Sequence, residues 1–79
     1  MLRFSVVSRE DCDLCEELLA QLRQFCATRE AAIDVVDVDS DPDLRRRYGH
    51  QVPVLLLDGE PICHGHFDAD EVVRLTRPR

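Results

Sequence analysis

The sequence contains no lysine, and all ten of its basic residues are arginine. This absence excludes enzymes that form a Schiff base on a lysine, and it excludes P-loops, in which a lysine contacts the bound phosphates. Basic residues are also outnumbered by 16 acidic ones, which leaves a formal net charge of −6. Because an acidic surface repels the phosphate backbone, we expect no nucleic acid among the partners of this protein.

The sequence also lacks a long apolar run. No stretch approaches the roughly 20 apolar residues that span a bilayer. Residues 1–7 hold no apolar segment of the length found in secretory signal peptides. We therefore expect no membrane partner and a cytoplasmic location, in which the four cysteines are reduced at rest.

Length and composition fit a single small globular domain over residues 1–79. Hydrophobic residues make up 44% of the chain and charged residues 33%, which is typical of a folded protein rather than a disordered one. No linker, internal repeat or low-complexity segment divides the chain. The small size and the acidic surface favour a monomer.

The most informative motif that is present is Cys12-Asp13-Leu14-Cys15. It follows an apolar stretch at residues 2–7 and lies where an amphipathic helix is expected to begin. The free N–H groups and the partial positive charge at a helix N-terminus favour a thiolate over a thiol. The spacing also lets the second sulfur reach the first and close a small disulfide ring. The motif in this position predicts a dithiol redox site.

Apolar residues recur with strand or helix periods along the whole chain. From Cys15 they follow the i, i+3, i+4, i+7 spacing of an amphipathic helix, and Ser40-Asp41-Pro42 is typical of a helix start. Asp58-Gly59 is typical of a hairpin turn, whereas Gly49 indicates a helix end and Asp68 a helix start. The predicted elements are a strand at 2–7, a helix from about 13 to 29, a strand at 33–38, a short helix from 42 to 47 or 48, strands at 52–57 and 60–63, and a last helix after Asp68.

These elements have the order β-α-β-α-β-β-α, which indicates an α/β fold. The strands at 2–7 and 33–38 are joined by a helix and should be parallel through a right-handed crossover. The strand at 33–38 is β-branched and mostly apolar, so we expect it inside the sheet. The last helix should turn three apolar residues toward the core, namely Val72, Val73 and Leu75.

This element order, with C-x-x-C at the first strand-to-helix turn, resembles the thioredoxin fold in its minimal glutaredoxin form. The pair Val52-Pro53 before the third strand is a second match. The resemblance covers nearly the whole chain and implies a three-layer sandwich with a four-stranded mixed sheet. It also implies a thiol–disulfide oxidoreductase. Segments that look like the small bacterial glutaredoxin-like proteins are Asp37-Val38-Asp39, Leu44, Tyr48-Gly49 and Val52-Pro53-Val54-Leu55.

The resemblance to glutaredoxins, and the positions of the residues along the chain, indicate roles for the two cysteines and for the Val52-Pro53 pair. Cys12 should be the exposed nucleophile, and Cys15, on the buried stripe of the helix, should be the resolving thiol. The resemblance implies a cis peptide bond before Pro53, which faces the two cysteines and shields them from metal. It also implies that the backbone of Val52 stays open for pairing with a substrate chain.

The sequence departs from the glutaredoxin pattern at two places. Asp13-Leu14 replaces the common Pro-Tyr, and His64-Gly65 lies where a Gly-Gly pair followed by acidic residues holds glutathione. We assign all four of these residues to substrate binding, together with Val52 and Pro53. Disulfide-bearing proteins or small-molecule disulfides are the expected substrates. No bound cofactor is expected, and the electron donor is either thioredoxin reductase or glutathione.

Acidic residues surround the motif, and only Arg9 opposes them. Nearby carboxylates disfavour a further negative charge, so they should shift the dithiol couple toward the reducing end. They should also repel glutathione, which is an anion. The flanking acids are Glu10, Asp11, Asp13, Glu16 and Glu17.

Metal binding is the main alternative chemistry, and a non-catalytic docking module is the alternative function. The ligand types for zinc or iron are present, but Pro53 should occlude the dithiol, so we assign no metal site. The alternation of aspartates at 37–43 looks like a calcium loop, yet Pro42 and Tyr48 stand where an EF-hand needs Gly and Glu. The candidate zinc or iron ligands are Cys12, Cys15, Cys63, His64 and His66.

The other two cysteines are expected to be structural. Cys26 lies 14 residues beyond Cys12 along the predicted helix, which is roughly 20 Å and too far for a disulfide. Cys63 ends the fourth predicted strand, where a regulatory or third redox thiol is the alternative. The run Arg45-Arg46-Arg47 is a solvated face, or a binding site for a carboxylate of glutathione or of an acidic partner.

Overall fold

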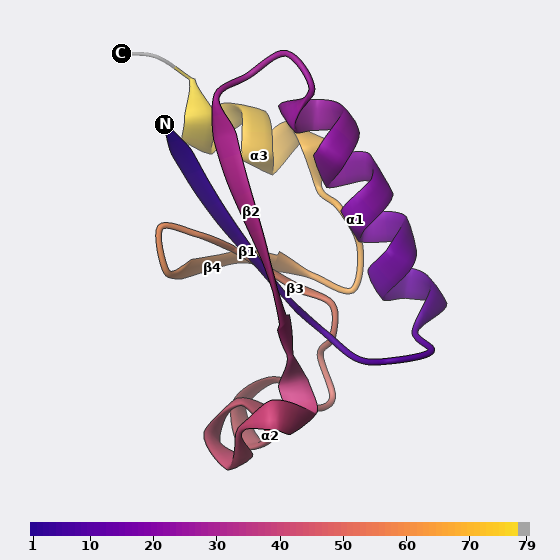
Figure 1. The fold of residues 1–79 in the computed structure, drawn as a ribbon. Coiled ribbons are helices and arrows are strands. Elements are labelled where there is room, and N and C mark those ends of the chain that lie inside the picture. The colour runs from indigo at the N-terminus through magenta and orange to yellow at the C-terminus, as the bar shows by residue number, and fades with distance from the viewer. Residues whose placement is uncertain (78–79) are drawn as a thin grey trace.

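Four strands form one mixed sheet in the order β2-β1-β3-β4 (Figure 1). The computed structural model describes residues 1–77. β1 pairs with β2 in parallel and with β3 in antiparallel orientation, and β3 and β4 form an antiparallel hairpin. The elements are β1 (Leu2–Ser8), α1 (Asp13–Cys26), β2 (Ala31–Asp37), the 3-10 helix η1 (Val38–Ser40), α2 (Pro42–Tyr48), β3 (Val54–Leu57), β4 (Glu60–His64) and α3 (Ala69–Thr76).

The helices lie on both faces of the sheet because apolar side chains of the central strands alternate between the two faces. Phe4 and Val6 of β1 pack with Leu18 of α1 and Val72 of α3 in the larger core. Val7 points the other way, into a second cluster that includes residues of α2. The predicted α/β sandwich with a mixed four-stranded sheet is therefore confirmed.

Helix α1 ends at Cys26, three residues before the predicted end at 29. The N–H of Ala27 donates to the Gln24 carbonyl, and the N–H of Arg29 donates to the Cys26 carbonyl. Both bonds span three residues rather than four, so the chain leaves the α-helix in tight turns. The longest described helix thus has 14 residues, and none within 1–77 is long and apolar enough to cross a membrane.

The prediction that residues 33–38 lie inside the sheet is wrong. β2 is an edge strand, and Val35 is 51% exposed. β-branched residues fit a pleated strand at any position, so composition did not distinguish an edge from a centre. The prediction for α3 is right only for Val72, because Val73 and Leu75 are each 40% exposed.

The third strand begins at Val54 rather than Val52, because the Val52–Pro53 segment precedes the ladder. Residue Pro53 has no N–H to donate to a neighbouring strand. The single predicted domain of 1–79 includes residues 78 and 79, which lie outside the described residues.

Candidate functional site

Cys12 and Cys15 lie where β1 passes into α1. Their Cα atoms are 5.2 Å apart and their sulfurs are joined as a disulfide, within the usual range of Cα separations for such a bond. Cys15 is 2% exposed and packs in the first turn of the helix, whereas Cys12 is only partly buried. Cys12 is therefore the more accessible of the two cysteines.

The backbone before α1 aims helix N–H groups at the Cys12 sulfur. Asp11 has a φ of 57°, a left-handed conformation that turns the chain from β1 into the helix. Cys12 is then the N-cap, and its sulfur accepts the N–H of Cys15 at 3.2 Å. The Cys12 carbonyl accepts the first helical bond, from the N–H of Glu16. In the reduced state the same donor and the helix dipole would stabilise a negative charge on this sulfur.

The predicted cis peptide bond between Val52 and Pro53 is present. Pro53 is buried, and its carbonyl oxygen accepts the N–H of Gly65 at 2.8 Å. Gly65 has a φ of +79°, a conformation that side chains disfavour, so a glycine is suited to this position. His64 is exposed and pairs with Val54 at the end of the hairpin. The structure thus brings Val52, Pro53, His64 and Gly65 together at one end of β3 and β4.

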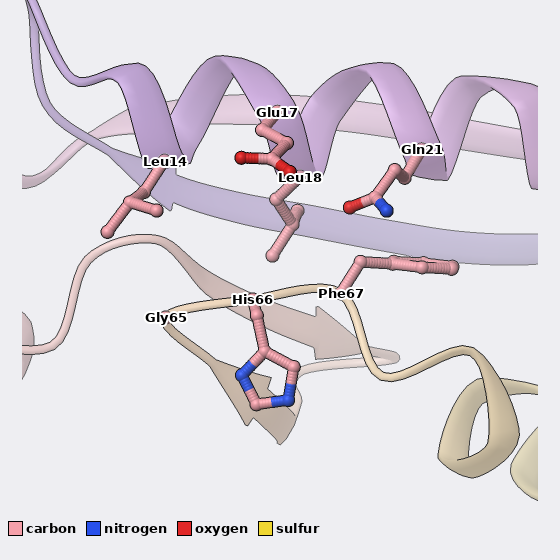
Figure 2. A pocket seen from close by; sticks show the side chains of 7 residues that line it. All are labelled: Leu14, Glu17, Leu18, Gln21, Gly65, His66 and Phe67. Carbon is pink, nitrogen blue, oxygen red and sulfur yellow. The ribbon is translucent and has the colours of Figure 1, made fainter.

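A cavity of about 210 Å³ lies between α1 and the segment that follows β4 (Figure 2). Of the predicted site residues, only Leu14 and Gly65 line it. Figure 2 shows Leu14, Leu18 and Gln21 extending from α1 toward this segment, while the imidazole of His66 extends away from α1. The lining residues are Leu14, Glu17, Leu18, Gln21, Gly65, His66 and Phe67.

This cavity was not predicted from the sequence, although the lining residues on α1 have a recognisable spacing. Leu14, Glu17, Leu18 and Gln21 are spaced i, i+3, i+4, i+7, which places them on one helix face. The other half, at residues 65–67, is brought near only by the tertiary fold.

The charge of Arg9 is directed away from the acids around the dithiol, contrary to the expectation that it opposes them. Its guanidinium donates to the Asp39 carboxylate at 3.1 and 3.3 Å and to the Gly49 carbonyl at 3.0 Å. Hydrogen bonding to Arg9, and the charges of Arg9 and Arg45, lower the pKa of Asp39. Among residues 1–77, the ion pairs join other carboxylates, and none includes an acid that flanks Cys12.

The side chains considered as alternative zinc or iron ligands do not form a metal-binding cluster among the described residues. Within the described chain, no three His, Cys, Asp or Glu side chains gather closely enough to hold a metal ion. The aspartates at 37–43 instead act as caps or pair with arginines. Asp37 accepts the N–H of Asp39, and Asp41 accepts that of Asp43, which itself pairs with Arg46.

Cys26 and Cys63 are free and half-buried, and both pack against the larger core. Burial raises the pKa of both thiols, and the carboxylates of Asp68 and Glu71 add to this effect at Cys63. A raised pKa leaves less thiolate at neutral pH, so neither thiol is activated for attack.

Comparison with known proteins gives one consistent result. The family model of the glutaredoxin-like domain (DUF836) matches residues 4–75. Protein Ne2328 from Nitrosomonas europaea, solved by NMR, is similar with 32% identity and a TM-score of 0.85, over 94% of this chain and 89% of that chain. A variant thioredoxin from Halobacterium salinarum is 28% identical with a TM-score of 0.62, over 94% of this chain and 70% of its own. The uncharacterized protein Rv0508 of Mycobacterium tuberculosis is 30% identical over 73 residues, which cover 84% of this chain and 71% of that protein.

Proposed function

The chain belongs to the glutaredoxin-like domain family, and we propose that it is a thiol–disulfide oxidoreductase that reduces protein disulfides with Cys12 and Cys15. The observation that carries the proposal is the position of Cys12. Cys12 is the more accessible cysteine, and its sulfur caps α1 and accepts a helix N–H at 3.2 Å, while the buried Cys15 lies within disulfide reach. A nucleophile must be accessible and able to ionise, and this position gives Cys12 access and a helix N–H that favours the thiolate against the neighbouring carboxylates.

The proposed cycle begins with the reduced dithiol. The Cys12 thiolate attacks one sulfur of the substrate disulfide, forms a mixed disulfide and releases the other substrate sulfur as a thiolate, which takes a proton from solvent. Cys15 then loses its proton and attacks the Cys12 sulfur. This step closes the Cys12–Cys15 disulfide and releases the second substrate thiol. The substrate gains two electrons and two protons, and the protein dithiol loses the same number.

Val52 and Pro53 are proposed to align the substrate chain beside the dithiol. Val52 precedes the β3 ladder, so its backbone is not paired in the described strand register. The hydrogen bond from Gly65 to the Pro53 carbonyl fixes this segment against the end of β4. An extended substrate could therefore add main-chain hydrogen bonds at Val52 while its disulfide meets Cys12.

The oxidised protein must be reduced again by thioredoxin reductase or by glutathione. The unpaired carboxylates near Cys12 favour a protein reductase over glutathione, because glutathione brings further negative charge to an acidic site. We propose a direct comparison of the two donors with the same disulfide substrate.

Single cysteine variants test the function. Cys12→Ser should abolish disulfide reduction, and Cys15→Ser should trap a mixed disulfide with a substrate, visible by mass spectrometry. A Cys26→Ser/Cys63→Ser double variant is the matched control and should retain the activity. Full activity in Cys12→Ser would reject Cys12 as the nucleophile, and no disulfide reduction by the unmodified protein would leave a docking module as the better account.

A further inference from the structure

The cavity beside α1 has one lining residue inside the C-x-x-C motif and another that is hydrogen-bonded to Pro53. Leu14 lies between the two cysteines, and Gly65 donates its N–H to the Pro53 carbonyl at 2.8 Å. A substrate chain that crosses both the dithiol and Val52–Pro53 would therefore run beside lining residues of the cavity. We propose that this cavity receives an arginine or lysine side chain next to the substrate disulfide, so that the protein prefers basic substrates. This inference rests on the proposed function and specifies its substrate class.

The walls suit the aliphatic stem of such a side chain. Leu14 and Leu18 form one wall, and Phe67 lies on the other (Figure 2). Phe67 packs against Phe25 with ring centroids 6.1 Å apart, and Phe25 meets Phe4 edge to face at 6.3 Å. Because Phe4 is 1% exposed in the core, this aromatic row holds Phe67 in place before any ligand arrives.

The polar part of the lining suits a cationic head group. Glu17 and Gln21 supply oxygen acceptors from α1, and Asp13 lies one helical turn before Glu17 on the same face. Within residues 1–77, neither carboxylate is in an ion pair. An apolar stem with a charged tip matches an apolar wall with a carboxylate at its edge.

Size and charge argue against other occupants. A volume of about 210 Å³ is below the roughly 300–1,000 Å³ typical of sites that enclose a whole small molecule. It is sufficient for one long side chain. An anionic group, whether a phosphate or a carboxylate of glutathione, would meet Glu17 and the neighbouring acids, and none of the described residues that line the cavity is an arginine.

The test uses the full chain in its reduced form and three disulfide peptides. The peptides are identical except for Arg, Gln or Glu next to the cysteine, and stopped-flow measurements give the rate constant for oxidation of the dithiol by each. We expect the order Arg > Gln > Glu. Glu17→Gln should lower the Arg-to-Gln ratio about two- to fivefold, the size expected for a partly exposed ion pair.

Glu30→Gln is the matched control, because it makes the same charge change in the turn after α1, away from the dithiol, and should leave the ratio unchanged. Gln21→Arg should also lower the Arg-to-Gln ratio, because the added guanidinium would pair with Glu17 one turn earlier. Equal rates for the Arg and Gln peptides in the unmodified protein, or equal effects of the Glu17 and Glu30 variants, would overturn the inference. If none of the peptides oxidises the dithiol, the proposed function itself fails, which is a separate outcome.

Discussion

The guanidinium of Arg9 connects the loop before Cys12 to the segment that leads to Pro53. It donates two hydrogen bonds to Asp39 and one, at 3.0 Å, to the carbonyl of Gly49, a residue that is buried. Arg9 lies three residues before the nucleophile, and Gly49 lies three residues before Val52. One side chain therefore fixes the two sides of the proposed substrate site relative to each other.

Replacing Arg9 by alanine should weaken both the fold and the reaction. Loss of the partly buried hydrogen bond to Gly49 leaves a carbonyl unpaired, and we expect a loss of about 1–2 kcal/mol in the free energy of unfolding, measured by urea titration. Disulfide reduction should slow because Cys12 and Val52 are no longer held together. Arg46→Ala is the control, since Arg46 pairs only with the exposed Asp43. Equal effects of the two substitutions would contradict a positioning role for Arg9.

The carboxyl of Asp39 should make stability depend on pH in the acid range. Its pKa is lowered in the folded state by Arg9 and Arg45. A lowered folded-state pKa gives a contribution that is complete above the unfolded pKa of about 4 and is lost as the pH falls through the folded value. Unfolding free energies of the unmodified protein and of Asp39→Asn should therefore differ at neutral pH and converge in acid. A difference that persists in acid would show that another interaction is responsible.

Local sequence signals predicted the elements that local interactions determine. Asp41 and Asp68 were expected to begin helices, and each accepts an N–H in the first turn of its helix. The C-x-x-C motif was expected at a strand-to-helix turn, and Cys12 is the N-cap there. Each of these features depends on residues no more than four apart, so the chain pattern is sufficient to predict it.

Features that depend on distant residues were not predictable in this way. The edge position of β2 follows from β3 pairing with the other side of β1, which no residue of β2 encodes. Arg9 and Asp39 are 30 residues apart, and the cavity joins α1 to the segment at 65–67. Burial of Val72 but not of Val73 or Leu75 likewise depends on how α3 docks on the sheet.

The Cys12–Cys15 couple should be reducing, with a potential near or below about −230 mV. The carboxylates that flank Cys12, which form no ion pair within residues 1–77, destabilise the Cys12 thiolate. They therefore favour the disulfide over the dithiol. Equilibration in dithiothreitol buffers, followed by alkylation and mass spectrometry, measures the value. Asp13→Asn should raise the potential by up to about 20 mV, the equivalent of one partly exposed charge interaction, whereas Glu30→Gln should not. A value close to that of strong oxidants, about −120 mV, would show that the helix N-terminus outweighs the acids.

Alanine substitutions at Gly65 and Gly59 should distinguish a role in disulfide reduction from a role in stability alone. Both have positive φ, at +79° and +85°, and an added Cβ would meet no atom within 4 Å at either position. Alanine at each should therefore cost a similar amount, about 1–2 kcal/mol, through backbone strain alone. Only Gly65 donates its N–H to the Pro53 carbonyl and lines the cavity, whereas Gly59 lies in the β3–β4 turn. Alanine keeps this N–H, but relief of the backbone strain at residue 65 would move the N–H away from Pro53 and shift the cavity lining, so Gly65→Ala should slow disulfide reduction more than Gly59→Ala when both are measured at a temperature where each variant is folded. Equal rates in the two variants would mean that the Gly65–Pro53 contact only stabilises the hairpin, and the substrate-aligning role of Pro53 would lose its structural support.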